Sequence, residues 1–369
     1  MNCRRAVAIT SFLRGGGMML PESRSGARAR TSVLAAALIS TIALGAANSA
    51  RAQSVEEFYA SKDITLYIGY SVGGGYDLYG RLVARHIGRY IPGNPTVVPI
   101  NMEGAGSLRL ANWMYSAAPK DGSAIGTVNQ GVPFTPLLGQ RDFAEYDPAE
   151  FFWIGSANEE ITVCVAMEHT GISTFEQLYD EELIIGGTGP GADEYFLHGL
   201  LRGVLDVRIR SITGYPGGNE INAAMERGEV DGRCGWSWAS VKVTRPDWLE
   251  QGTINVLLQL GLSKHPDLPD IPLIMDLTDN EQDLQLLRLV MATGPFGRPF
   301  LAPPGIPADR AAALEAAFNA TVTDPQFLAE AELLRAEIRP VLSPELRRVL
   351  AEVYATSPQT VERARALLR

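Results

Sequence analysis

Three glycine-rich turns have the residue types and spacing of an anion-binding site. They are Ser71 to Asp77, Asn101 to Ser107, and Gly186 to Gly191. The first turn follows a β-branched run at 64–70 and precedes an apolar helical pattern. At such a junction, unpaired backbone N–H groups and the positive end of a helix dipole face one point, and glycine has no Cβ to block an anion. Three turns of this kind predict a binding cleft.

The predicted ligand contacts come from two opposed groups of residues. The first group is Tyr70, Gly74, Gly75, Tyr76, Gly104, Ala105, Gly106 and Ser107, and the second is Thr188, Gly189, Gly191, Tyr215 and Gly217. Tyr215 could cover a ligand with its ring, or be a core tyrosine at a strand end. Asp231 and Arg233 are weaker candidates, because Arg233 could hold a carboxylate through two hydrogen bonds unless Asp231 already occupies it.

Motifs for metal binding or covalent catalysis are missing from the sequence. The four histidines, at positions 86, 169, 198 and 265, are far apart and show no zinc-ligand spacing. There is no GxSxG nucleophile turn and no GxGxxG or Walker pattern. We therefore expect no metal, no cofactor and no enzymatic activity. A serine or cysteine nucleophile with a histidine base remains an alternative that the sequence alone leaves open.

The first 52 residues have the pattern of a secretory signal peptide with an upstream leader. Arg28 and Arg30 precede an apolar run at 33–44, and Ala50-Arg51-Ala52 supplies small residues for cleavage. The run is too short for a membrane-spanning helix, which needs roughly 20 apolar residues. The mature chain is expected to begin at Gln53, with the true start codon at Met1, Met18 or Met19.

Charge and cysteine content restrict the possible partners and the compartment. The chain has a net charge of −10, and removal of the arginine-rich leader leaves it more acidic. Such a chain is a poor candidate for nucleic-acid binding, which depends on clustered Lys and Arg. Cys164 and Cys234 are the cysteines left after cleavage, in an oxidising compartment. They form either a disulfide or two buried thiols.

One predicted helix, at 77–91, carries Asp77 and an arginine stripe. Arg81, Arg85 and Arg89 recur at every fourth residue, separate from the apolar positions. We interpret the stripe as a solvated face, with contact to a partner protein as the alternative. Asp77 is best placed as the residue that caps the helix N-terminus.

The order of predicted elements indicates an α/β protein with two domains. Strands and helices alternate from 53 to 160 and again from 161 to about 260, and the remainder from Pro307 onward is predicted to be helical. The economical arrangement returns the chain near 285–300 and lays its last helices on the first domain. Domain 1 is then 53–160 plus 290–369, and domain 2 is 161–289. Two crossings would make a two-strand hinge.

Several segments resemble the substrate-binding proteins of tripartite tricarboxylate transporters, the Bug or TctC family. The resemblance covers nearly all of the mature chain. The matching segments are Tyr70 to Asp77, Asn101 to Ser107, Ala118 to Gly122, Tyr215 to Gly218, Gly228 to Asp231 and Pro303 to Pro307. It implies a type II-like periplasmic binding protein, each lobe a βα sheet sandwiched by helices, with a carboxylate held by the first two turns.

The resemblance implies a function in transport. We expect a monomeric periplasmic receptor that binds a small organic acid between its lobes and delivers it to the permease subunits of such a transporter. A secreted hydrolase or transferase that uses the same cleft is one alternative. A carboxylate-sensing subunit of a signalling system is another. A dicarboxylate, a tricarboxylate and an aromatic acid all remain open as ligands.

Overall fold

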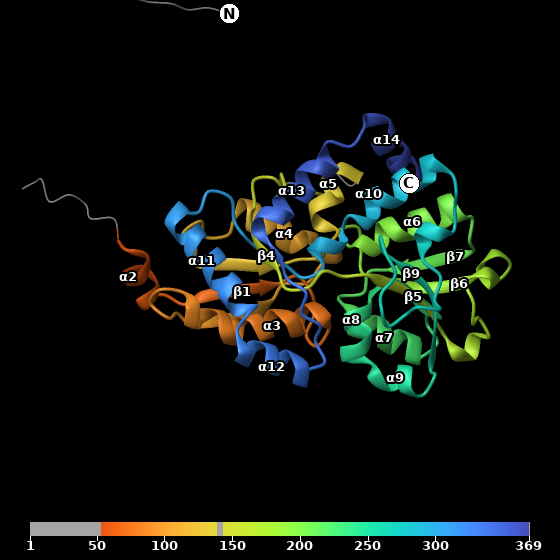
Figure 1. Ribbon diagram of the computed structural model, residues 1–369, viewed down its shortest axis with the longest axis horizontal. Coiled ribbons are helices and arrows are strands. Elements are labelled where there is room, and N and C mark those ends of the chain that lie inside the picture. Colours follow the sequence, from red (N-terminus) through yellow and green to blue (C-terminus); the bar gives the residue numbers. More distant parts are fainter. Residues whose placement is uncertain (1–52, 139–142, 369) are drawn as a thin grey trace, which may run out of the picture. The chain divides into compact units, whose positions relative to one another are not determined.

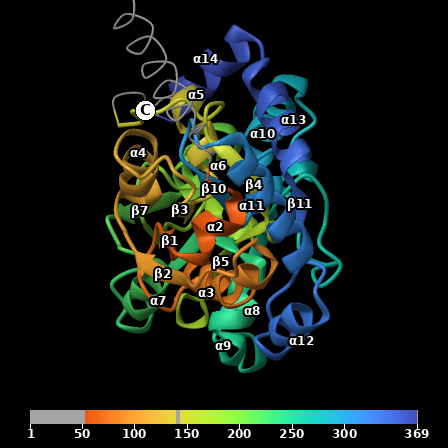
Figure 2. The ribbon, with the colours of Figure 1, turned by 90° about the vertical axis from the view of Figure 1, so that its left-hand side faces the viewer.

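The computed structural model describes residues 53–138 and 143–368, so the predicted signal peptide lies outside the described residues. Within this part, the chain builds two β-sheets with helices on both faces of each (Figures 1 and 2). We call each sheet, with the helices packed on it, a lobe. No helix in the described part of the chain is both long and apolar enough to cross a bilayer.

The first sheet has six strands in the order β11-β4-β10-β3-β1-β2. β2, β1 and β3 are parallel, whereas β10 pairs antiparallel with both β3 and β4. The strands are β1 (Ile64–Ile68), β2 (Val97–Asn101), β3 (Ala124–Thr127), β4 (Phe152–Ser156), β10 (Pro299–Ala302) and β11 (Val341–Leu342). β10 and β11 were not expected, because their segments contain Pro and Gly punctuation and short helical patterns.

The second sheet has five strands in the order β7-β6-β8-β5-β9. β7, β6 and β8 are parallel, and β5 pairs antiparallel with β8 and β9. The strands are β5 (Thr162–Met167), β6 (Leu183–Gly187), β7 (Ile209–Thr213), β8 (Gly232–Ser237) and β9 (Ile254–Leu260). In each sheet, the antiparallel strand in the interior, β5 or β10, directly follows a passage of the chain from the other sheet.

Helices cover both faces of the first sheet because its strands point apolar side chains to both sides. On β4, Ile154 packs into the cluster formed with α3 and α11, while Trp153 packs into the cluster that includes α4 and α13. Figures 1 and 2 show α3 and α13 on opposite sides of this sheet. The helices of this lobe are α2 (Val55–Ala60), α3 (Gly75–Ile87), α4 (Leu108–Ser116), α5 (Thr135–Leu138), α11 (Ala308–Thr321), α12 (Pro325–Leu333) and α13 (Ser343–Tyr354).

The second sheet is sandwiched in the same way. Cys164 on β5 packs toward α6 and α10, whereas the neighbouring Val163 packs toward α7, α8 and α9. The helices are α6 (Asp193–Leu205), α7 (Gly218–Glu226), α8 (Trp238–Thr244), α9 (Pro246–Glu250) and α10 (Glu281–Met291). Short 3-10 turns are η1 (Gly88–Tyr90), η2 (Ala105–Ser107), η3 (Val132–Phe134), η4 (Glu168–Thr170), η5 (Glu176–Tyr179), η6 (Ile274–Asp276) and η7 (Gly294–Phe296). These layers confirm the predicted two-lobed α/β fold class.

The chain passes between the lobes twice in its middle part, after β4 and after α10. The two passing segments lie side by side, since Ala157 N–H donates to the carbonyl of Arg298 (2.9 Å) and Glu160 N–H donates to that of Gly294 (3.0 Å). The last helix, α14 (Pro358–Leu367), departs from the expected position on the first domain, because it packs on α10 and α6 of the second lobe as well as on α5.

The arginine stripe of α3 is partly exposed to solvent, as predicted, and its members also form ion pairs within the chain. Arg85 pairs with Glu330 (2.6 Å) and Arg89 with Asp324 (3.1 Å), so both hold α12 against α3. Arg81 pairs instead with Asp77 (2.9 Å). Asp77 is not the helix cap, because α3 already begins at Gly75. Its buried carboxylate reaches back to accept the N–H of Gly73 (2.9 Å) and so orders the first glycine turn.

Candidate functional site

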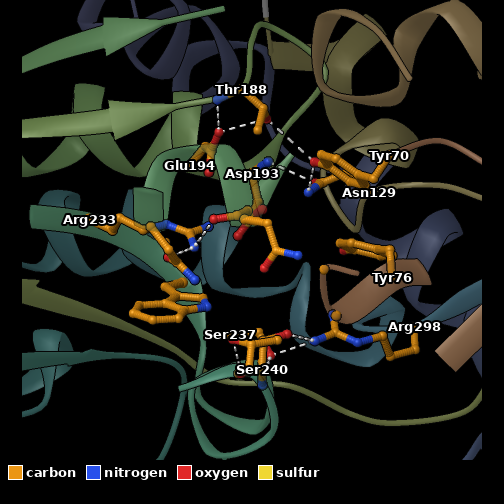
Figure 3. A pocket seen from close by; sticks show the side chains of 18 residues that line it. Tyr70, Tyr76, Asn129, Thr188, Asp193, Glu194, Arg233, Ser237, Ser240 and Arg298 are labelled. Atoms are coloured by element: carbon orange, nitrogen blue, oxygen red, sulfur yellow. Dashed lines mark hydrogen bonds between the residues drawn. The ribbon is translucent and has the colours of Figure 1, made fainter. Parts of the chain in front are cut away.

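A cavity of about 50 Å³ lies where loops and helix starts of the two lobes meet (Figure 3). One wall comes from the first glycine turn and the start of α3, and the other from the starts of α6 and α7 and from β8. It is lined by Tyr70, Gly74, Gly75, Tyr76, Asn129, Thr188, Asp193, Glu194, Gly218, Asn219, Asn222, Arg233, Gly235, Trp236, Ser237, Ser240, Thr244 and Arg298. One water needs roughly 10–15 Å³ of such space, so the cavity has room for about three to five.

Helices α3, α6, α7 and α8 begin at this cavity, and α3 and α7 leave backbone donors free. The N–H groups of Gly75 in α3 and Gly218 in α7 donate to no acceptor within the described part of the chain. Helix α6 begins with Asp193 and Glu194, whose carboxyl groups face its own positive end. The free N-termini of α3 and α7 therefore favour an anion.

Two stacked tyrosines form the first-lobe wall. The rings of Tyr70 and Tyr76 lie 4.8 Å apart at an interplanar angle of 21°. Tyr76 is fixed by the N–H of Gln130, which donates to its hydroxyl (3.0 Å). Tyr70 is fixed by Asn129, whose amide donates to its hydroxyl (2.8 Å), while the Asn129 oxygen accepts the N–H of Asp193 (2.9 Å). These bonds tie the rings to the start of α6.

Arg298 closes one end of the cavity and joins the two lobes. Its guanidinium forms a buried ion pair with Glu160 (3.1 Å) and donates to the hydroxyls of Ser237 (2.6 Å) and Ser240 (2.7 Å). It also lies over the ring of Tyr76, 4.7 Å from the ring centre. The Nε of Arg298 is buried and has no hydrogen-bond partner among the described residues.

Arg233 is the second buried guanidinium and is less fully paired. Its Nη1 donates to Asn222 Oδ1 (3.0 Å) and to the carbonyl of Gly218 (3.3 Å), and its plane lies 4.6 Å from the ring centre of Trp236. No acceptor in the described part of the chain takes a hydrogen bond from its Nη2 or Nε. Burial lowers the pKa of Arg233 to about 10, so it stays charged at neutral pH.

Two buried carboxyl groups stand beside Arg233. Glu194 Oε1 accepts from both the hydroxyl (2.7 Å) and the N–H of Thr188, and Asp193 accepts from the side-chain amide of Gln130 (2.6 Å). Burial raises the pKa of both, that of Glu194 to about 7, although Arg233 opposes the shift at Glu194. The cavity thus contains an acid that titrates near neutral pH.

Six of the residues predicted from the sequence line this cavity. They are Tyr70, Gly74, Gly75, Tyr76, Thr188 and Arg233. The structure therefore brings the first glycine turn together with one residue of the third, and with one of the two weaker candidates. Whether these residues contact a ligand remains a prediction.

The second glycine turn lies against the third rather than lining the cavity. Gly191 N–H donates to the carbonyl of Ala105 (3.0 Å), and Gly189 packs on the same residue. Four consecutive residues, Gly104, Ala105, Gly106 and Ser107, have positive φ angles, which costs energy at the two that are not glycine. Ser107 also donates its hydroxyl to the carbonyl of Gly69 (3.1 Å). Ala105 and Gly106 meet Gly189 and Gly191 in a backbone contact between the lobes, and the predicted residues Gly104 and Ser107 flank this contact.

The remaining predicted residues also lie outside the cavity lining. Tyr215 is partly buried against the apolar cluster of α7, α8 and β8. Gly217 precedes α7 and packs on Ser71 of the first glycine turn. Asp231 contributes its backbone to the sheet, through an N–H that donates to Ile184 (2.7 Å), and forms no ion pair with Arg233.

Most of the missed lining residues carry no sequence signal for a site. Arg298 follows a Gly-Pro segment that has no pattern, and it reaches the cavity because the chain returns there from the second lobe. Asp193 and Glu194 did have a signal, since two adjacent acids open a helix directly after a glycine turn. Asn129 and Ser240 reach the cavity only through the tertiary fold.

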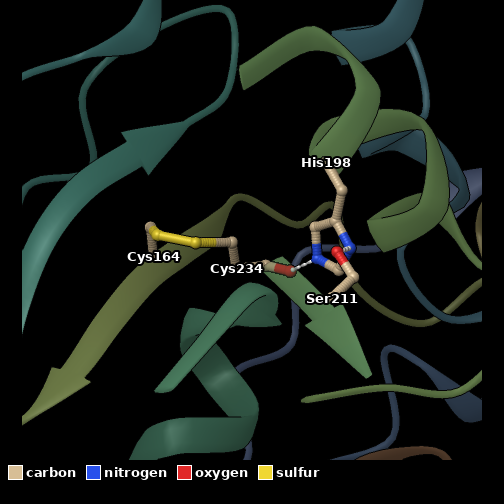
Figure 4. Close-up of a disulfide and its surroundings, with 4 residues drawn as sticks. All are labelled: Cys164, His198, Ser211 and Cys234. Atoms are coloured by element: carbon tan, nitrogen blue, oxygen red, sulfur yellow. Dashed lines mark hydrogen bonds between the residues drawn. A yellow bond between two sulfur atoms is a disulfide. The ribbon is translucent and has the colours of Figure 1, made fainter. Parts of the chain in front are cut away.

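Cys164 and Cys234 face each other on β5 and β8 and are joined by a disulfide in the structure (Figure 4). Next to it, His198 Nε2 lies 2.9 Å from the carbonyl of Cys234, and Nδ1 lies 2.9 Å from the hydroxyl of Ser211. Burial lowers the pKa of His198 to about 4, so it is neutral near pH 7. Neither His198 nor Ser211 lines the cavity.

Within the described residues, no group of three or more His, Cys, Asp or Glu side chains is placed to hold a metal ion. No protein-family model and no curated protein sequence matches the chain. Solved structures do match it. The periplasmic binding protein BugD aligns with a TM-score of 0.66 at 21% sequence identity, over 83% of this chain and 98% of that chain.

The chain has the fold of the Bug and TctC periplasmic binding proteins. MatC from Rhodopseudomonas palustris, solved with malate, aligns with a TM-score of 0.64 at 18% identity, over 84% of this chain and 99% of MatC. A TctC solute-binding protein from Polaromonas aligns with a TM-score of 0.54 at 16% identity, over 84% of this chain and 99% of that one. The Bug/TctC fold agrees with the resemblance seen in the glycine turns.

Proposed function

We propose that this chain is a periplasmic receptor that captures a small organic carboxylate between its lobes and delivers it to a tripartite tricarboxylate-type permease. One observation carries the proposal. The free N-termini of α3 and α7 and the partly unpaired guanidinium of Arg233 all meet in one cavity between the lobes. Each of these groups binds carboxylates well in a site from which water is largely excluded.

Ligand entry requires the lobes to separate. Ser71 donates its hydroxyl to Glu220 (2.8 Å), Gln130 bonds Asp193, and Gly191 bonds Ala105, so contacts between the lobes surround the cavity. The two paired segments at 157–161 and 292–298 are the proposed two-strand hinge. Rotation about them would open these contacts while leaving each sheet intact. The proposed domain limits, 53–160 plus 290–369 and 161–289, follow the same passages of the chain.

Structural neighbours support a carboxylate as the ligand class. MatC was solved with malate, and another R. palustris protein, with a TM-score of 0.65 at 18% identity, was solved with adipate. A binding protein of this kind would need the predicted signal peptide to reach the periplasm. In its closed, ligand-bound state it would then bind a membrane permease. We propose a monomer, since the cavity is completed by one chain.

One observation is consistent with the enzyme alternative. Ser211 and His198 are within hydrogen-bond distance, as a nucleophile and its base would be. However, no carboxylate of the described residues orients the imidazole, whose other nitrogen faces a backbone carbonyl, and neither residue lines the cavity. The sensor alternative shares the same cavity and differs only in the partner of the closed form.

A thermal-shift screen of the mature chain against dicarboxylic, tricarboxylic and aromatic acids tests the proposal. An acid at 100 times its Kd stabilises the folded state by about 2.7 kcal/mol, which raises the melting temperature by a few degrees. Stabilisation by at least one acid supports the receptor. If no acid stabilises the chain, and ester or phosphate ester substrates are hydrolysed instead, the enzyme alternative replaces it.

A further inference from the structure

Helix α14 makes a third connection between the lobes, separate from the two paired segments of the proposed hinge. The chain leaves α13 of the first lobe through the segment 355–357, and α14 then lies on α6 and α10 of the second lobe (Figure 1). α14 also touches α5 of the first lobe, where the Nε of Arg365 donates to the carbonyl of Leu137 (2.9 Å). This helix therefore bridges α5 and α6 across the boundary between the lobes.

The segment 355–357 is short, and the sequence fixes where it ends. Helix α13 ends at Tyr354, and Ser357 begins a new helix by accepting the N–H of Thr360 (3.1 Å). Pro358 follows directly, and proline suits the first position of a helix but not the continuation of α13. Three fully extended residues span at most about 11 Å. While α14 stays on the second lobe, the separation of the lobes is limited by this reach.

The end of α14 fits into a place on α6 that two glycines leave open. A Cβ on Gly199 would meet Leu368, and a Cβ on Gly203 would lie 2.6 Å from Cδ2 of Leu367. Leu368 is buried, and its carbonyl accepts the hydroxyl of Tyr195 on α6 (3.2 Å). The second lobe thus holds α14 through buried apolar contacts, whereas the first lobe holds it through Arg365 and the short segment.

The elements that α14 bridges are the ones that meet at the ligand cavity. Helix α6 begins at the cavity with Asp193, and α5 follows the turn that contains Gln130 and Gly131. Gln130 donates its side-chain amide to Asp193 (2.6 Å), and a Cβ on Gly131 would lie 2.5 Å from the backbone nitrogen of Asp193. Separation of the lobes at the cavity must therefore move α6 away from α5 under α14.

Direct packing of the lobes is interrupted beside the segment 355–357. A groove of about 510 Å³ lies between α10 of the second lobe and α13 of the first, and its lining includes Arg288, Leu289, Val349, Val353 and Thr356. Because this groove separates the two helices, their side chains do not fill the space between the lobes here. On this side of the molecule, α14 is the element that joins them.

We propose that α14 and the segment 355–357 act as a strap that favours the closed arrangement of the lobes and limits their opening. The inference rests on the lobe separation that the proposed function requires. Opening must lift Leu368 from α6 or pull Arg365 away from α5, and both movements break contacts. The strap therefore raises the population of the closed arrangement before a ligand arrives, so less of the binding free energy is spent on closure.

Distances between spin labels on the two lobes test the strap in the mature, ligand-free chain. The labels are attached at Ala117→Cys, after α4, and at Arg210→Cys, on β7, both of which are exposed sites. Leu368→Asp places a charge in the buried contact with α6 and should shift the distances to longer values. The matched control is Ala366→Asp, because Ala366 lies on the exposed side of the same helix. The control should keep the wild-type distances.

A second variant releases the strap at its other end. Arg365→Met keeps an apolar stem but loses the hydrogen bond to the carbonyl of Leu137, and it places no charge in a buried contact. It should also lengthen the distances, so the test does not depend on the folding of Leu368→Asp. For the tightest-binding acid, both variants should show faster dissociation and an affinity weaker by roughly fivefold or more. A purely structural role would lower the melting temperature without changing the distances.

The outcomes separate the strap from the receptor. Unchanged distances in Arg365→Met and in folded Leu368→Asp overturn the strap, and so does an equal shift in Ala366→Asp. Longer distances in the two strap variants alone support it. The label distances are measured without any acid, so they decide the strap even if the screen of acids finds no ligand and the receptor is overturned.

Discussion

Glu194 is a buried carboxyl group that weakens the ligand-free protein. Its pKa is raised from that of an ordinary glutamate to about 7 because the side chain is buried. The folded state therefore holds this proton more tightly than the unfolded state does. Stability contributed by the protonated form is fully present below the unfolded pKa, and it is lost as the pH rises toward 7. Such a cost is typical of a residue kept for binding.

Glu194→Gln should accordingly stabilise the ligand-free chain in a pH-dependent manner. The difference from wild type should be small at pH 4, grow between about pH 4.5 and 7, and level off above pH 7 at up to about 3 kcal/mol. Chemical denaturation at several pH values measures it. A difference that does not change with pH would mean that the Glu194 carboxyl titrates normally in the folded state.

Arg233 is the residue on which the carboxylate grip depends most. Arg233→Gln removes the unused guanidinium donors and should weaken binding of the best acid roughly 30-fold or more, since losing one partner of a buried charge pair costs about 2 kcal/mol or more. Titration calorimetry at pH 6 measures the loss while Glu194 is largely protonated, so that its unpaired charge does not unfold the variant.

The matched control is Arg227→Gln. Arg227 pairs with Glu229 on the surface and lines no part of the cavity, so this variant should bind as the wild type does. Equal affinities for Arg233→Gln and the wild type would show that the acid binds without the guanidinium of Arg233.

The second and third glycine turns meet where the two lobes touch. A Cβ on Gly106 would lie 2.5 Å from the backbone nitrogen of Ala192 and 2.9 Å from the carbonyl oxygen of Gly189. Backbone atoms cannot yield as a flexible side chain can. Glycine is required at this position by the approach of the opposite lobe.

Gly106→Ala should therefore weaken ligand binding by holding the lobes apart, with the fold of each lobe retained. Gly171→Ala is the matched control, because Gly171 also has a positive φ (77°) but nothing lies within 4 Å of its Cβ position. In both variants alanine must adopt a left-handed backbone conformation, which costs stability. Only Gly106→Ala should lose affinity for the ligand in calorimetry. An unchanged affinity in Gly106→Ala would show that this contact does not support binding.

The disulfide joins two strands of the second sheet. Cys164 and Cys234 are separated by 70 residues, and a loop of this length predicts a stabilisation of about 4 kcal/mol from restriction of the unfolded chain. The double variant Cys164→Ala, Cys234→Ala should melt several degrees lower than the oxidised wild type. If the two proteins have the same melting temperature, or if free thiols are titrated in native periplasmic protein, the disulfide does not stabilise the chain.

At the scale of the whole molecule, the sequence predicted the fold better than the site. Strand-to-helix alternation and the glycine turns were enough for two α/β lobes, because these patterns are local. Gly75 and Thr188 were predicted for the same reason. Arg298, Asn129 and Ser240 were not, because only the return of the chain and the meeting of the lobes bring them together.

Some sequence patterns cannot distinguish a ligand contact from a contact within the chain. The glycine turns at Gly106 and Gly189 were assigned to the ligand, since a bare turn before a helix looks alike whether an anion or another backbone approaches it. In the structure these two turns lie against each other, and whether they also contact a ligand remains a prediction. Arg85 and Arg89 are exposed as predicted, but their ion pairs with Glu330 and Asp324 could not be predicted because these partners lie far along the chain.

A crystal structure of the mature chain with its tightest-binding acid tests the central claim most directly. We expect density for one acid inside the cavity, with a carboxylate within hydrogen-bond distance of Arg233 and of the backbone N–H groups at Gly75 or Gly218. An acid bound elsewhere on the molecule, with this cavity filled only by water, would contradict it.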